Sequence, residues 1–226
     1  MSIPLYFSIF EEEFASAMAK QENLAVYCGS FGSAGLQGTP RRLPPNAKIA
    51  VFSDRFLPQS PASTAQTIIQ FCKSGGLTTL LLDFERKTND ALRNLISTLT
   101  STLPNTYTVI LPTAYWTAGR CQVLALCAVT APCSSWAAEM QHFQAAFPNQ
   151  WCLELTPWRV CPKDFCPPIH APIRQGACCH VCRTAQGLAL WDSRQSLQRK
   201  IEAAEQHGCR LAIGLGCELK ALTDAE

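Results

Sequence analysis

The sequence lacks any concentration of positive charge. Its 19 basic and 17 acidic residues nearly balance, giving a formal net charge of +2 over 226 residues. Nucleic-acid binding needs a basic stripe that follows the phosphate backbone, and the charges here are spread along the chain instead. We therefore expect no nucleic-acid partner.

A long hydrophobic run is also missing. The N-terminal segment MSIPLYFSIFEEE has no basic start and only a short apolar run, and three glutamates, residues 11–13, follow directly. This pattern is typical of neither a signal peptide nor a membrane span, so we expect no membrane partner and a cytoplasmic protein. No segment suggests a linker and no repeat is visible, which favours a single domain over residues 1–226. The oligomeric state is left open.

Cysteine, by contrast, is abundant. The chain has 13 cysteines, and this odd number leaves at least one thiol unpaired in any redox state. In a reducing cytoplasm, cysteine behaves mainly as a small buried hydrophobic residue. A secreted disulfide scaffold is the alternative, and the missing export signal argues against it.

Four of the cysteines have a spacing that could hold a structural zinc ion. Cys161, Cys166, Cys179 and Cys182 form a C-x4-C-x12-C-x2-C pattern. However, ACCHVCRTAQGLALWD predicts a β-hairpin insertion near residues 177–191, and in a strand Cys179 and Cys182 face opposite sides. We therefore expect free thiols, with no metal and no cofactor. A cysteine-rich metal-binding module is the weaker alternative.

Eight short apolar runs predict eight β-strands. Most are apolar throughout, which is typical of strands buried on both faces of a parallel sheet. They span residues 3–10, 24–30, 48–54, 78–84, 107–113, 122–130, 151–157 and 210–216.

Amphipathic helices separate several of these strands. One starts at Ser60-Pro61, the next is capped by Thr88, a third carries Trp136 and Phe147, and the last starts near Ser193. Alternating strands and helices predict a single (β/α)8 TIM-type barrel of the α/β class, with an open doubly wound sheet as the alternative. The barrel should be lean, because residues 29–47 and 112–120 lack a helical pattern, so that one or two outer helices are missing.

Two carboxylates close the strand in LTTLLLDFER, residues 77–86. Asp83 and Glu85 are two residues apart, so in a strand they point to the same side. Two acids backed by leucines repel each other and lose hydration, so one should have a raised pKa and serve as an acid near neutrality. The alternative is a strand that simply becomes polar where it meets solvent, with Arg86 and Lys87 neutralising the acids.

Other acids also follow predicted strands. Asp54 and Glu218 stand at the C-terminal ends of the third and eighth strands, where barrel active sites lie. Both are candidates for substrate binding, although Asp54 could instead pair with Arg55. Glu154 stands inside an apolar strand, where a carboxylate is paired, functional or turned outward.

Two stretches resemble the family 18 glycoside hydrolases, the chitinase-type barrels. IIQFCKSGGLTTLLLDFE, residues 68–85, is similar to that family's helix, turn and fourth strand, whose signature is D-G-x-D-x-D-x-E. ALWDSRQSLQRKIEAAEQHGCRLAIGLGCEL, residues 189–219, is similar to the unit that closes the barrel. The resemblance implies Glu85 as the general acid and Asp83 as the residue that orients the acetamido group of the substrate. In this family that acetamido group is itself the nucleophile.

The signature is only half present. Thr78, Thr79 and Leu81 replace an aspartate, the glycine and the middle aspartate of the family motif. The family's tryptophan on the eighth strand falls on Cys217. Tyr115 and Trp158 are candidates to replace the missing aromatic contacts with substrate.

We therefore carry two hypotheses. The first is a hydrolase-like protein that acts on a glycan containing N-acetylglucosamine. The second is a catalytically inactive barrel relative used for carbohydrate binding or protein interaction.

Overall fold

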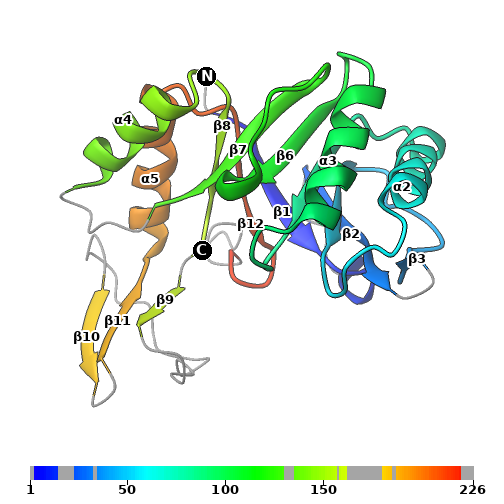
Figure 1. The fold of residues 1–226 in the computed structure, drawn as a ribbon. Coiled ribbons are helices and arrows are strands. Elements are labelled where there is room, and N and C mark those ends of the chain that lie inside the picture. The colour runs from blue at the N-terminus through cyan, green and yellow to red at the C-terminus, as the bar shows by residue number, and fades with distance from the viewer. Residues whose placement is uncertain are drawn as a thin grey trace.

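The computed structural model describes residues 3–14, 23–32, 35–129, 135–156, 158–161, 180–184 and 187–219. Eight parallel strands form its main sheet, and β1 pairs with both β12 and β2, so the sheet is closed (Figure 1). The predicted barrel is confirmed, and the open doubly wound alternative is wrong. All eight predicted strands are present: β1 Leu5–Ile9, β2 Leu24–Gly32, β4 Ala47–Ser53, β5 Thr79–Asp83, β6 Thr108–Pro112, β7 Gln122–Ala128, β8 Trp151–Glu154 and β12 Ala212–Leu215.

Strand side chains alternate between two apolar layers. In β5, Leu80 and Leu82 belong to the large core between the barrel and its helices, whereas Leu81 belongs to a smaller cluster inside the barrel. Ile49, Ile110 and other apolar residues of the neighbouring strands fill the same interior. Because side chains alternate along a strand, Asp83 and Glu85 follow Leu81 on the inner side. The acids therefore lie at the C-terminal mouth of the barrel.

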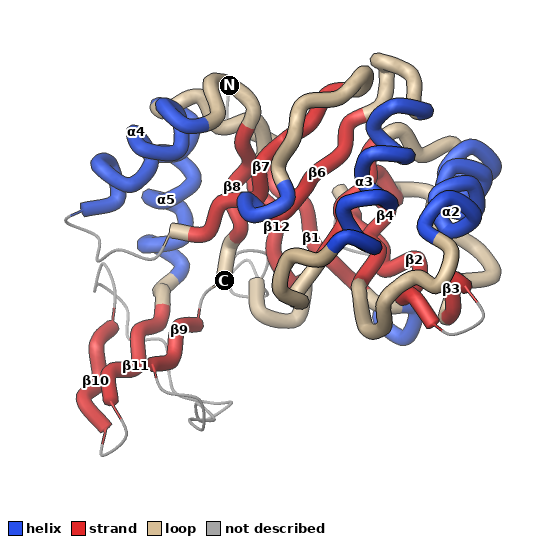
Figure 2. Tube along the Cα trace, in the orientation of Figure 1, coloured by secondary structure: helices blue, strands red, loops and turns tan. Residues whose placement is uncertain are grey.

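Four helices among the described residues cover the barrel on two sides (Figure 2). α2 (Pro61–Gly75) and α3 (Asp90–Thr102) pack side by side on one flank, and α4 (Trp136–Ala146) and α5 (Arg194–Gln206) on the other. The expected cap of α3 is off by one residue, because Asn89, not Thr88, accepts the backbone N–H of Leu92, at 3.0 Å. Asparagine at this position satisfies a donor that the first helical turn leaves free.

The barrel is as lean as the sequence predicts. Within the described residues between β2 and β4 there is a short strand, β3 (Gly35–Gln37), antiparallel to β2, and no helix. After β6 the chain makes one 3-10 turn, η2 (Thr113–Tyr115), and another, η1 (Glu11–Glu13), follows β1. The described residues that follow β6 therefore form a loop at the barrel mouth rather than a helix.

A second, three-stranded antiparallel sheet lies near the C-terminal part of the chain. It is formed by β9 (Trp158–Cys161), β10 (His180–Thr184) and β11 (Gly187–Trp191), with His180 opposite Trp191 in the β10–β11 pair. The predicted hairpin insertion falls on β10 and β11. The assignment of residues 1–226 to one domain stays a prediction. No helix among the described residues is long and apolar enough to cross a membrane.

Candidate active site at the barrel mouth

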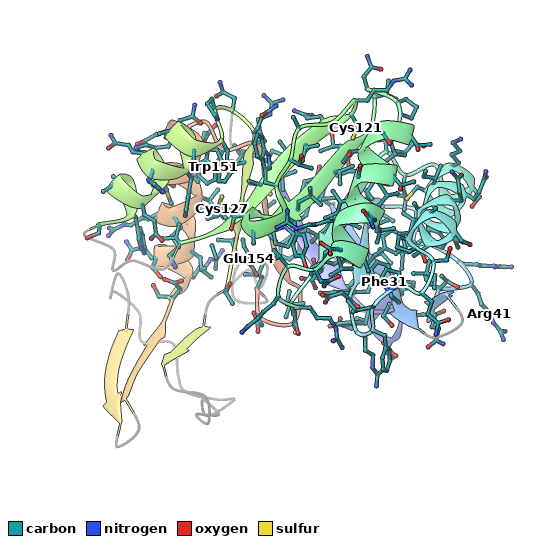
Figure 3. All side chains as sticks on the ribbon, viewed as in Figure 1. Phe31, Arg41, Cys121, Cys127, Trp151 and Glu154 are labelled. Carbon is teal, nitrogen blue, oxygen red and sulfur yellow. The ribbon has the colours of Figure 1, made fainter. Side chains whose placement is uncertain are left out.

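A pocket of about 170 Å³ opens at the C-terminal ends of the strands. Four carboxylates from three parts of the chain line it, and these are Asp83, Glu85, Glu154 and Glu218. Asp83 closes β5, Glu154 closes β8 (Figure 3) and Glu218 follows β12. The structure thus brings together the two acids expected to act on substrate and two further acids that the sequence singled out.

Asp83 is held by a tyrosine from a different strand. The Tyr27 hydroxyl, on β2, donates a hydrogen bond to Asp83 Oδ2 at 2.6 Å. Burial raises the pKa of Asp83 above its usual value of 3.8, the negative charge of Asp54 adds to this, and the bond from Tyr27 acts in the opposite direction. Burial and the nearby Asp83 charge also raise the pKa of Tyr27, which keeps the phenol protonated as the donor.

The sequence predicts that one of the two acids has a raised pKa, and burial raises the pKa of Asp83, which is half-buried. The Glu85 side chain is exposed. A protonated Asp83 could donate to a neighbouring oxygen, and an ionised one could accept from an amide N–H. Asp83 can therefore act as a hydrogen-bond donor or as an acceptor next to the second acid, Glu85.

Asp54 holds the backbone that carries Glu85. Its carboxylate is 3% exposed and accepts the backbone N–H groups of Glu85 at 3.0 Å and Arg86 at 2.9 Å. The expected alternative partner was the Arg55 side chain, but the guanidinium that contacts this segment is that of Arg86, which donates to the Asp54 carbonyl at 2.9 Å. Asp54 therefore lies at the mouth, as predicted, with both carboxylate oxygens engaged by the chain. Its predicted contact with substrate stays a prediction.

Tyr115 also contacts the segment that follows β5. The side chain is 5% exposed, its ring packs edge-on against Phe84 at 5.5 Å, and its hydroxyl donates to the Lys87 carbonyl at 3.1 Å. The residue thus holds the loop after β5, and its predicted contact with substrate stays a prediction. Trp158 begins β9, but its side chain lies outside the described residues.

A second, more open pocket of about 540 Å³ shares Tyr27, Asp83 and Glu85 with the first. Its remaining lining residues are Phe10, Ser53, Asp54, Arg55 and Arg86. Phe10 is 45% exposed and stacks on Tyr27, with ring centroids 4.2 Å apart and planes 8° apart. The two pockets adjoin at these three shared residues, and we call them together the cleft. Phe10 and Tyr27 form its aromatic wall.

Tyr27 and Phe10 were not predicted as site residues from the sequence. A signal for Tyr27 was present, because it lies two residues after Ala25, which faces the barrel interior, and so it shares that side of β2. Phe10 directly follows β1. Because it ends an apolar run, the sequence pattern alone cannot distinguish it from a core residue. Both aromatic residues are functional candidates. Recognising them from the sequence requires knowing which side of each strand faces the barrel interior.

The seven cysteines whose side chains the structure describes are free thiols. Those buried in the core are Cys28, Cys72, Cys121, Cys127, Cys152 and Cys209, whereas Cys217 is exposed near the cleft residue Glu218. Among the residues that the structure describes, no group of three or more metal-binding side chains gathers. Cys166 and Cys179 of the zinc pattern lie outside the described residues, and for Cys161 and Cys182 only the backbone is described.

Comparison with known proteins finds likeness in structure alone. No protein-family model matches the chain, and no curated protein matches it. The spore cortex-lytic enzyme SleL of Bacillus cereus aligns over 98% of this chain and 74% of its own, with 12% identity and a TM-score of 0.60. A family 18 chitinase of Cycas revoluta, solved in complex with (GlcNAc)4, aligns over 95% of both chains with 12% identity and a TM-score of 0.60.

A fungal structure gives the same result. A chitinase of Rhizomucor miehei aligns over 96% of this chain and 97% of its own, with 13% identity and a TM-score of 0.58. At such identities the alignments show that the barrel is shared. They agree with the resemblance to family 18 barrels in the sequence.

Proposed function

We propose that the chain is a glycoside hydrolase-like protein that acts on a glycan containing N-acetylglucosamine, with Glu85 as the general acid and Asp83 assisting. The observation that carries this proposal is that Asp83 and Glu85 line one cleft at the barrel mouth, with Asp83 fixed by Tyr27. The barrel is shared with a chitinase that was solved with (GlcNAc)4 bound, which supports a glycan ligand.

The chemistry follows from the two acids. The acetamido oxygen of the substrate attacks the anomeric carbon as the glycosidic bond breaks, and Glu85 gives its proton to the leaving oxygen. Asp83 accepts the acetamido N–H and so aligns the nucleophile. Water then adds to the anomeric carbon, returns a proton to Glu85 and frees the acetamido group. Asp54, Tyr115, Trp158 and Glu218 are the further residues that we propose for substrate binding.

One observation favours the second hypothesis, a non-catalytic glycan-binding barrel. Leu81 stands where the family signature has its middle aspartate, and this leucine lines the pocket beside Asp83 while only 4% exposed. An apolar side chain there cannot share a proton or a charge with Asp83. The cleft would then keep its aromatic wall and hydrogen-bonding groups for binding without hydrolysis.

Hydrolysis of an aryl glycoside of N-acetylglucosamine and of chitin oligomers separates the two hypotheses. We expect the purified protein to cleave at least one of these substrates, Glu85→Gln to lose that activity and Asp83→Asn to weaken it. Asp90→Asn, on the exposed first turn of α3, is the matched control and should leave activity unchanged. Full activity in Glu85→Gln would remove the assignment of the acid. Oligomer binding without any cleavage would support the non-catalytic barrel, and neither binding nor cleavage would contradict both.

A further inference from the structure

We propose that the Arg55 and Arg86 side of the cleft binds the carboxylate of an acidic sugar, so that the preferred glycan is anionic. This inference rests on the proposed function, since it concerns the ligand of the same cleft. Arg55 and Arg86 line the larger pocket together with Asp83 and Glu85. The bound carboxylate would therefore lie next to the proposed catalytic acids.

The Arg86 guanidinium is held in place and still has free donors. Its Nε donates to the Asp54 carbonyl at 2.9 Å and its Nη2 donates to the Arg55 carbonyl at 2.7 Å. A guanidinium has five N–H donors, so these two bonds leave others for a ligand. The planar fork of arginine matches a carboxylate, and a fork that is already fixed loses less side-chain entropy on binding.

The positive charges of the two arginines have no acidic partner among the described residues. Within the part of the chain that the structure describes, neither Arg55 nor Arg86 forms an ion pair with a carboxylate. The carboxylate of Asp54 is turned to the backbone N–H groups of Glu85 and Arg86 instead. Arg55 is exposed, and its guanidinium lies 5.9 Å from the ring centroid of the exposed Phe56.

The aromatic residues of the same pocket suit a sugar ring. Phe10 and Tyr27 form a parallel aromatic stack, and the exposed Phe10 offers an apolar edge in a pocket of about 540 Å³. This volume is within the range of about 300–1,000 Å³ that small-ligand sites occupy. A sugar ring packed on this wall could present an acidic substituent to the arginines. A neutral oligomer would offer neither arginine a negative charge.

Binding to the intact chain carrying Glu85→Gln tests the inference without hydrolysis. The probes are a chitin tetramer, a tetramer of alternating N-acetylglucosamine and N-acetylmuramic acid, and the methyl ester of the second tetramer. The acid and ester differ mainly in the negative charge. By calorimetry we expect the acid to bind about tenfold tighter than its ester, as a charge-assisted bidentate contact predicts, and salt to reduce this preference.

Single substitutions in the same background assign the preference to the two arginines. Arg55→Met and Arg86→Met should each reduce the acid-over-ester ratio several-fold, whereas Arg41→Ala, on the exposed loop far from Glu154 in Figure 3, should not. Arg86→Met also removes the hydrogen bonds from Arg86 to the Asp54 and Arg55 carbonyls. Arg55→Met is the cleaner variant, because it keeps the backbone carbonyl that accepts from Arg86. Binding of the chitin tetramer reports any general damage to the cleft.

The outcomes separate this inference from the proposed function. Equal binding of acid and ester, with the chitin tetramer still bound, overturns the anionic preference and leaves the proposed function standing. A preference that survives in both Arg55→Met and Arg86→Met also overturns it. If no oligomer binds at all, the proposed function fails and the inference fails with it.

Discussion

The Tyr27 hydroxyl and Asp83 Oδ2 lie 2.6 Å apart, and their hydrogen bond joins β2 to β5 across the end of β4, which lies between them in the sheet. The bond fixes the inner carboxylate of the Asp83 and Glu85 pair at the barrel mouth. It also links the aromatic wall of the cleft to its acids, because Tyr27 stacks on Phe10. The state of Asp83 therefore depends on a residue 56 positions away in the sequence.

Removing the Tyr27 hydroxyl should make Asp83 a weaker acid. In Tyr27→Phe the hydrogen bond that stabilises the carboxylate is lost while burial remains, so the pKa of Asp83 should rise further. NMR titration of the aspartate carboxyl carbons measures this change directly. Tyr6→Phe is the control, since Tyr6 is another partly buried tyrosine packed against the barrel interior. An unchanged Asp83 titration in Tyr27→Phe would show that the hydrogen bond does not stabilise the carboxylate.

Neutralising Asp54 should loosen the backbone that carries Glu85. In Asp54→Asn an amide replaces a carboxylate that accepts two backbone N–H groups, so one donor at this 3% exposed site loses its acceptor. An unsatisfied buried donor costs about 1–3 kcal/mol, and we expect the free energy of unfolding to fall by that amount. If Glu85 is the acid, kcat should fall as well.

Urea denaturation and steady-state kinetics check both effects of Asp54→Asn. The exposed Asp90→Asn should change the free energy of unfolding by no more than about 0.5 kcal/mol. Asp54→Glu keeps the charge and should recover part of the activity if the role is to position Glu85. Unfolding free energies that are equal for Asp54→Asn and Asp90→Asn would contradict the bracing role.

The fold could be predicted from sequence because it depends on patterns that repeat. Eight apolar runs separated by turn and helix signals are enough to predict a barrel. The alternation of side chains around Leu81 places Asp83 and Glu85 on the inner side. The bracing roles of Asp54 and Tyr115 could not be predicted, because they depend on contacts between side chains and the backbone of a distant loop. A strand-end carboxylate has the same sequence pattern whether it faces a ligand or accepts N–H groups from its own chain.

A buried ion pair should stabilise the flank opposite to α2 and α3. The Lys200 ammonium, on α5, contacts the Asp192 carboxylate, and both residues are under 10% exposed. Ser196 donates to the other Asp192 oxygen at 2.9 Å, and Lys200 lies 5.0 Å from the ring centroid of Trp136. Lys200→Met leaves the Asp192 charge buried without its ammonium, so the free energy of unfolding should fall by about 3–5 kcal/mol.

A double-mutant cycle tests whether the loss comes from the pair. Lys200→Met combined with Asp192→Asn should recover much of the stability, because neither charge is then left alone. Lys73→Met, on the exposed last turn of α2, is the control for losing a lysine and should have little effect. Additive losses in the double variant would mean that Asp192 and Lys200 do not stabilise each other.

The pH dependence of stability should reveal the burial of Asp83. Burial raises its pKa above 3.8, so the folded protein takes up a proton at a higher pH than the unfolded chain. The unfolding free energy from this group therefore falls as pH rises from about 3.8 through the folded pKa, and the cost is fully present above it. Asp83→Asn removes this cost, so its stability relative to the original protein should increase as pH rises through that window. Chemical denaturation from pH 3.5 to 7 measures the difference, with Asp90→Asn to report the effect of an exposed aspartate, and a difference that stays constant with pH would contradict a raised pKa at Asp83.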